Sequence, residues 1–205
     1  MLGRVKDISV QAEDDLILGR EPGRHILEKV SSALREVPNF TVVPVDLSSI
    51  RFMDFSASDE FVVKLVKRIR AEEFSSRFIV LKGMNEMVQE NVEAALKLSE
   101  EVCVYYSPLS NEEPLIAGTM PSTLESTYQL ALKLNVITAR ELIEEVEQYQ
   151  MQAHNKEHKT GPHEKLNIGA SSNRLTRLKE MGLLVPIRVD SLAVGGRQNV
   201  YEPVR

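Results

Sequence analysis

The chain has 205 residues, of which 42% are hydrophobic and 27% charged, and its formal net charge is −5. This length allows one large domain or two small ones, each with its own core. No apolar run approaches the roughly 20 residues that span a bilayer, and Met1–Gln11 lacks the apolar region of a secretory signal. We therefore expect a cytoplasmic protein without membrane contact. The single cysteine, Cys103, excludes an internal disulfide and lies in an apolar run typical of a buried strand.

The charge is distributed unevenly along the chain. Residues 1–120 carry 14 basic and 20 acidic side chains, whereas residues 121–205 carry 11 basic and 10 acidic ones. Within residues 168–205, six basic side chains stand against three acidic ones. Because local charge sets the field at a binding face, this C-terminal segment is the one whose electrostatics suit a phosphate backbone.

The first half alternates strand and helix signals. Strands are expected at Val5–Val10, Thr41–Leu47, Arg77–Leu81, Val102–Tyr106 and Leu115–Ala117, and helices at Arg20–Glu36, Ser56–Glu72 and Asn85–Ser99. This order predicts an α/β domain, a mixed sheet with covering helices, at residues 1–120. The connection between strands 77–81 and 102–106 is long enough for a right-handed crossover, so these strands should be parallel.

The second half, residues 121–205, predicts three helices and a hairpin. Ser122–Leu134 is helical, and Thr138 opens a second helix through a capping box with Glu141. A third helix, capped by Ser171 or Ser172, should end at Glu180 before Gly182. Leu184–Val189 and Asn199–Val204 are strand-like and are joined by a turn that contains Gly195 and Gly196.

The segments TARELIEEV (138–146), SSNRLTRLKEMGLL (171–184) and RVDSLAVGGRQNVYEPV (188–204) resemble the bacterial winged helix-turn-helix regulators. The resemblance implies a winged helix that binds double-stranded DNA. Leu175, Leu178 and Leu183 should bury one side of the third helix. The side chains left for DNA are Ser171, Ser172, Asn173, Arg174, Thr176 and Arg177 on the helix, and Arg197, Gln198 and Asn199 on the wing.

These residue types can recognise bases and phosphates in a DNA groove. Serine donates to phosphates, asparagine pairs with adenine and arginine with guanine. The alternative is that Arg174 and Arg177 belong to a solvated helix face.

The sequence departs from the winged-helix pattern in one place. The family joins its second and third helices by a short turn, whereas about 15 to 20 residues intervene here. Either the second helix runs on through Gln152, or an excursion protrudes near the DNA. The polar segment HNKEHKTGPHEK (154–165) predicts a loop. It holds His154, His158 and His163 but no thiolate, so we expect no metal site.

The segment VVPVDLSSIRFMDFSASDEFVVKLVKRIR (42–70) resembles STAS domains, the fold of anti-sigma-factor antagonists, and still more the STAS-like domains of unknown function in bacterial proteins. In antagonists the corresponding turn reads D-S-S-G and its second serine is phosphorylated. That position is Ser56 here, with Asp54 before it, Phe55 in place of the first serine and Ala57 in place of the glycine. Ser56 is therefore either a phosphorylation site or a helix cap, and the cap is the interpretation we favour.

Together these features predict a sequence-specific DNA-binding protein, a bacterial-type transcriptional regulator with a STAS-like sensing or dimerisation domain. Two-fold operators predict a homodimer. The alternative is a non-enzymatic protein–protein interaction module, similar to an anti-sigma-factor antagonist, that binds a protein partner through the N-terminal domain. No catalytic signature is found, GREPGR (19–24) lacks the end of a P-loop, and we expect neither enzymatic activity nor a cofactor.

Overall fold

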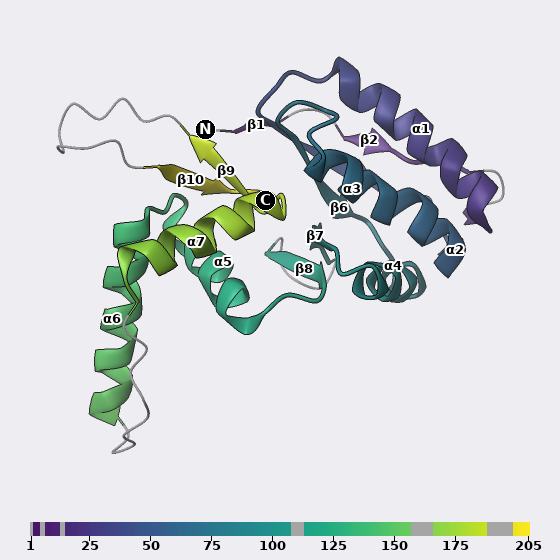
Figure 1. Ribbon diagram of the computed structural model, residues 1–205. Coiled ribbons are helices and arrows are strands. Elements are labelled where there is room, and N and C mark those ends of the chain that lie inside the picture. The colour runs from purple at the N-terminus through teal and green to yellow at the C-terminus, as the bar shows by residue number, and fades with distance from the viewer. Residues whose placement is uncertain (1, 5–6, 13–14, 108–112, 157–165, 188–198) are drawn as a thin grey trace. The chain divides into compact units, whose positions relative to one another are not determined.

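A computed structural model of the chain describes residues 2–4, 7–12, 15–107, 113–156, 166–187 and 199–205. The contacts divide the chain into two compact units (Figure 1). The N-terminal unit comprises Met1–Met120 with Val204–Arg205, and the C-terminal unit comprises Pro121–Pro203. Among the described residues, no helix combines the length and the apolar character that crossing a bilayer requires.

The N-terminal unit is a mixed α/β structure with a largely parallel sheet, as the sequence predicts. The strands of this sheet are β1 (Gly3–Arg4), β2 (Ile8–Ser9), β4 (Thr41–Asp46), β6 (Arg77–Lys82), β7 (Val102–Tyr106) and β8 (Pro114–Gly118). A separate parallel pair is formed by β3 (Leu16–Ile17) and β5 (Phe52–Met53). The helices are α1 (Arg20–Glu36), α2 (Phe55–Ser58), the π-helix η2 (Asp59–Val63), α3 (Lys64–Arg70) and α4 (Glu86–Leu98).

Neighbouring strands of the larger sheet are not all consecutive in the chain. The order β1–β4–β6–β7–β8, with β2 also paired to β4, is parallel up to β7 and antiparallel at β8. The predicted parallel pairing of strands 77–81 and 102–106 is therefore confirmed. Alternate strand residues and the apolar faces of the helices form one core: Val43, Val45, Ile79, Leu81, Cys103 and Tyr105 pack with Leu27, Val30, Phe61, Leu65, Val88 and Val92.

The predicted helix Ser56–Glu72 is in fact three consecutive segments. A π-helix, η2, interrupts the α-helical hydrogen bonding between α2 and α3. Phe61 and Leu65 are still completely buried, because the extra residue of a π-turn shifts the register of the helix without removing its apolar face. The predicted strand Val5–Val10 is represented by the shorter β2, and residues 5–6 lie outside the described part.

The C-terminal unit holds helices α5 (Ser122–Leu134), α6 (Ala139–Lys156) and α7 (Ile168–Glu180), followed by strands β9 (Leu184–Ile187) and β10 (Val200–Pro203). The two strands pair antiparallel, with Val200 opposite Ile187 and Pro203 opposite Leu184. Ile137, between α5 and α6, forms a single antiparallel bridge to Tyr201 through two backbone hydrogen bonds. This bridge ties the helices of the unit to its hairpin.

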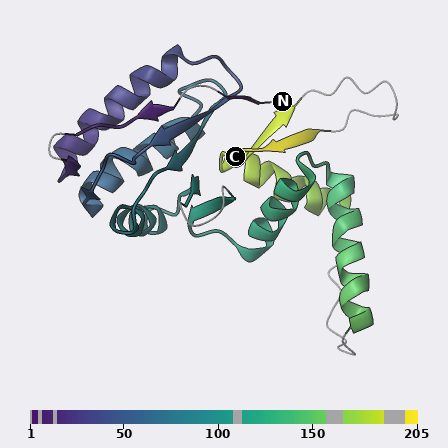
Figure 2. The ribbon, with the colours of Figure 1, turned by 180° about the vertical axis from the view of Figure 1, so that it is seen from behind.

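Helix α6 bears on whether the second helix of this unit runs on through Gln152, which the sequence left open. It runs past Gln152 to Lys156, so His154 is helical rather than part of a loop. Figure 2 shows its second half extending away from α5 and α7. Its start is confirmed as a capping box, since Glu141 Oε2 accepts from Thr138 N at 2.8 Å and Glu141 N donates to Thr138 Oγ1 at 3.2 Å. His158 and His163 lie outside the described residues.

Candidate nucleic-acid interface

The helix expected to contact DNA, α7, begins earlier than the sequence predicts. Its N-cap is Asn167, whose Oδ1 accepts from Ala170 N at 2.8 Å. The prediction that Ser171 or Ser172 caps this helix is wrong, because both lie inside it. An asparagine is as good an N-cap as a serine, and Asn167 occupies the extended backbone position that a cap needs.

The end of α7 follows the prediction. Gly182 has φ 75°, and its amide donates to Lys179 O, while Leu183 N donates to Leu178 O, both at 2.9 Å. These two bonds form a Schellman motif. Leu178 and Leu183 are both buried, which supplies the apolar contact that accompanies this motif.

Three residues bury one side of α7: Ser171, Leu175 and Leu178. Ser171 is completely buried, and its Oγ has no hydrogen-bond partner among the described residues. This burial contradicts the expectation that Ser171 contacts DNA. A serine is small enough to fit where a helix packs closely, so residue type alone did not reveal its orientation.

The opposite side of α7 is polar and exposed. Helical residues advance by about 100° each around the axis, so the residues directly opposite the buried side can be identified. We call this set the outward stripe: Gly169, Asn173, Thr176, Arg177 and Glu180, all of which are exposed.

The remaining predicted contacts lie elsewhere. Ser172 and Arg174 are half-buried and lie on the flanks of α7 rather than on the outward stripe. Asn199 is exposed directly before β10. Arg197 and Gln198, together with Gly195 and Gly196 of the predicted turn, lie outside the described residues. The structure thus brings Asn173, Thr176 and Arg177 together on one helix face.

Comparisons of the chain with family models, curated proteins and solved structures found no match.

In the N-terminal unit, Asp54 rather than Ser56 is the cap. Asp54 Oδ1 accepts from Ala57 N at 2.7 Å, and Oδ2 accepts from Gly19 N at 2.9 Å. One carboxylate therefore caps α2 and also holds Gly19, the N-cap residue that precedes α1. The prediction of Ser56 as the cap is wrong, because the helix begins one residue before it, and Ser56 is half-buried in the first turn.

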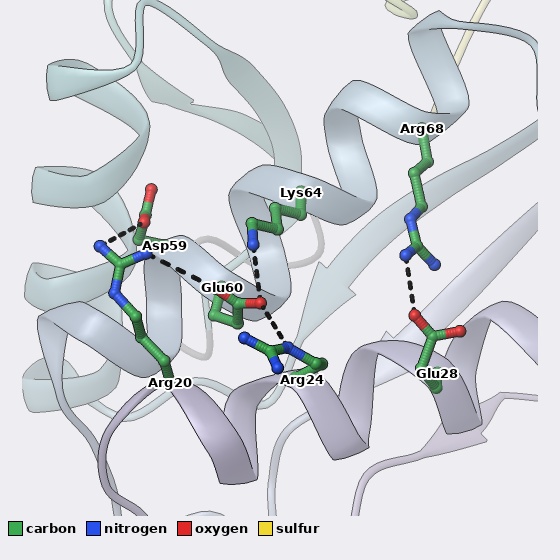
Figure 3. Close-up of polar contacts among 7 residues, drawn as sticks. All are labelled: Arg20, Arg24, Glu28, Asp59, Glu60, Lys64 and Arg68. Carbon is green, nitrogen blue, oxygen red and sulfur yellow. Dashed lines mark hydrogen bonds and ion pairs between the residues drawn. The ribbon is translucent and has the colours of Figure 1, made fainter.

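A charged cluster that the sequence did not reveal lies between α1 and η2–α3 (Figure 3). The side chain of Glu60 is only 2% exposed. Its Oε1 accepts from Arg24 Nε at 3.0 Å and lies 2.7 Å from Lys64 Nζ. Its Oε2 lies 3.6 Å from Arg20 Nη1. The hydrogen bond from Lys64, followed by that from Arg24, holds the pKa of Glu60 below its usual value despite its burial.

The backbone of α1 approaches this cluster closely. A Cβ on Gly23 would lie 2.9 Å from the carbonyl oxygen of Ala57, so only glycine fits there. The neighbouring pair Arg68–Glu28, at 2.7 Å, makes a second link between α3 and α1. The sequence signal for the cluster was the i, i+4 spacing of Arg20 with Arg24 and of Glu60 with Lys64.

The cysteine and the acidic and histidine side chains bear on catalysis and metal binding. Cys103 is buried as predicted, and burial raises the pKa of its thiol to about 12, so it is not a thiolate at neutral pH. Among the described residues, no group of three or more His, Cys, Asp or Glu side chains could hold a metal ion.

Proposed function

We propose that the protein binds double-stranded DNA through the outward stripe of α7. The observation that carries this proposal is the exposure of Asn173, Thr176 and Arg177 on one face, opposite a side fixed by buried leucines. Asparagine and arginine form bidentate hydrogen bonds with adenine and guanine in the major groove. Helix-turn-helix proteins insert into the major groove a helix of this kind, with one side packed against the protein core and a polar, exposed opposite side.

The architecture of the C-terminal unit supports a winged helix as its fold. Three helices precede an antiparallel pair, β9–β10, and Ile137 bridges to that pair in the way that a short third strand would. In this proposal the hairpin is the wing, and Asn199 lies at its base. We further propose a transcriptional regulator that acts as a cytoplasmic homodimer, with the N-terminal unit as a STAS-like domain that senses or pairs.

The test is duplex binding by single-site variants of the full chain. With a duplex selected from a random pool, Asn173→Ala and Arg177→Ala should each weaken binding about tenfold, the value of one lost bidentate contact. The matched control is Lys179→Ala, which removes an exposed charge from the flank of the same helix. It should change affinity less than about threefold, since a flank residue makes at most a phosphate contact.

Two outcomes oppose the proposal. If both stripe variants bind as tightly as the unmodified chain, the outward stripe is not the contact face. If Arg177→Ala and Lys179→Ala lose affinity equally while Asn173→Ala loses none, the interaction is a general attraction to charge and not groove reading.

A second candidate, a protein-docking module, is favoured by one observation in the N-terminal unit. Leu18 and Phe55 flank the double cap of Asp54 and are 51% and 37% exposed. Large exposed apolar side chains at a rigid helix start suit a protein partner. This candidate predicts that Leu18→Asp abolishes binding of a protein partner, and that the unmodified chain binds no duplex even at low salt.

A further inference from the structure

The backbone conformation of Gly169 does not require a glycine. It is exposed within α7, and its φ is not in the left-handed region. A Cβ built on it would meet only Asn167 Oδ1, at 3.3 Å. Because this oxygen also accepts from Ala170 N as the cap of α7, it would have to shift by a few tenths of an ångström while keeping that bond. By contrast, Gly182 has φ 75° and has a clear backbone reason to be glycine.

A glycine in a helix carries a cost. Apart from proline it is the least favourable residue there, because it has the most backbone freedom to lose. Backbone strain does not explain Gly169, and its one close contact is a single side-chain oxygen, so we look for its reason outside the folded unit. One established use of glycine is to let a backbone approach a ligand closely.

The position of Gly169 indicates which ligand. It lies one helical turn before Asn173, on the outward stripe, where any side chain would project toward whatever Asn173 contacts. We propose that Gly169 is the point of closest approach between α7 and duplex DNA. The missing side chain lets the helix backbone lie against the wall of the major groove, which brings Asn173 within reach of the base edges. This inference rests on the proposed DNA binding.

The experiment adds side-chain volume at this position in the full chain. Gly169→Ala and Gly169→Leu should leave the melting temperature unchanged or raise it, since both residues favour helix. Their affinity for the selected duplex should nevertheless fall, by about fivefold for alanine and about fiftyfold for leucine, as the added volume pushes the helix out of the groove. Ser126→Ala and Ser126→Leu, at an exposed position of α5, are the matched controls and should leave affinity unchanged.

The outcomes separate this inference from the function on which it rests. If the unmodified chain binds no duplex, the proposed function fails and the inference fails with it. If the unmodified chain binds and the Gly169 variants bind equally well, only the inference is overturned. A marked drop in melting temperature for Gly169→Ala also overturns it, because the glycine would then have a structural reason.

Discussion

At the scale of single residues, Glu60 holds three helical segments together through one carboxylate. Arg20 and Arg24 come from α1 and Lys64 from α3, while Glu60 itself belongs to η2. The carboxylate is almost fully buried, whereas the three cations keep 44–63% of their side chains exposed. Removing the acid therefore leaves cations that water can solvate, so the loss should be smaller than the cost of leaving a fully buried charge unpaired.

We predict that Glu60→Gln lowers the free energy of unfolding at pH 7 by about 1–3 kcal/mol. The pKa of Glu60 is lowered in the folded state, chiefly by the hydrogen bond from Lys64. The charged form therefore stabilises the fold above the ordinary glutamate pKa of 4.5, and this contribution is lost as pH falls through the lower folded pKa. Urea unfolding at a series of pH values measures the difference.

Glu28→Gln is the control for this prediction. Glu28 also accepts from an arginine, Arg68, at 2.7 Å, but its side chain is 52% exposed. An exposed ion pair of this kind contributes less than about 1 kcal/mol. Equal losses for the two variants would show that the burial of Glu60 has no energetic consequence.

At the scale of elements, the capping box at the start of α6 carries a prediction. Thr138 and Glu141 exchange hydrogen bonds at the surface, and Thr138→Ala should cost about 1 kcal/mol because the amide of Glu141 then loses its partner, while the amide of residue 138 keeps Glu141 Oε2. Thr123→Ala is the comparison, since Thr123 is exposed in the first turn of α5 but does not cap it. Chemical denaturation distinguishes them, and an equal effect on stability contradicts a capping role.

The sequence predicted the helices well where apolar residues recur with helical spacing over several turns. It predicted them less well where a single residue decides where a helix begins. Arg20–Glu36 and Ser122–Leu134 have the bounds that their periodicity predicts. Two helix caps were misplaced. The observed caps are Asp54 and Asn167, whereas the sequence favoured serines a few residues later in each case. Backbone geometry rather than residue type selects the cap. The pair β3–β5 is only two residues long per strand, too short for alternation to show.

The candidate interface was predicted in part for a related reason. The leucine period gave the buried side of α7, and with it the exposure of Asn173, Thr176 and Arg177. The same period places Ser171, four residues before Leu175, on the buried side. The prediction missed this because it took Ser171 as the cap of the helix and not as a residue within it. Gly169 was outside the predicted helix and so was not considered.

At the scale of the whole molecule, charge is divided between the two halves of the sequence. Residues 1–120 are acidic, while residues 121–205 have nearly balanced charge. An attraction to DNA must then come from a few local side chains, since the net charge of the chain is −5. This limits the number of phosphate contacts that binding can use, and so limits its salt dependence.

We predict a shallow but definite salt dependence for duplex binding by the full chain. Each phosphate contact contributes about −0.9 to the slope of log affinity against log salt. With Arg174 and Lys179, the basic residues on the flanks of α7, as its phosphate contacts, the slope should be about −2. Lys179→Ala should bring the slope about one unit closer to zero, whereas Lys97→Ala in the N-terminal unit, where Lys97 pairs with Glu93, should not change it. Fluorescence anisotropy titrations over a range of salt concentrations give these slopes. Affinity independent of salt would mean that α7 contacts no phosphates, because counterion release accompanies every such contact.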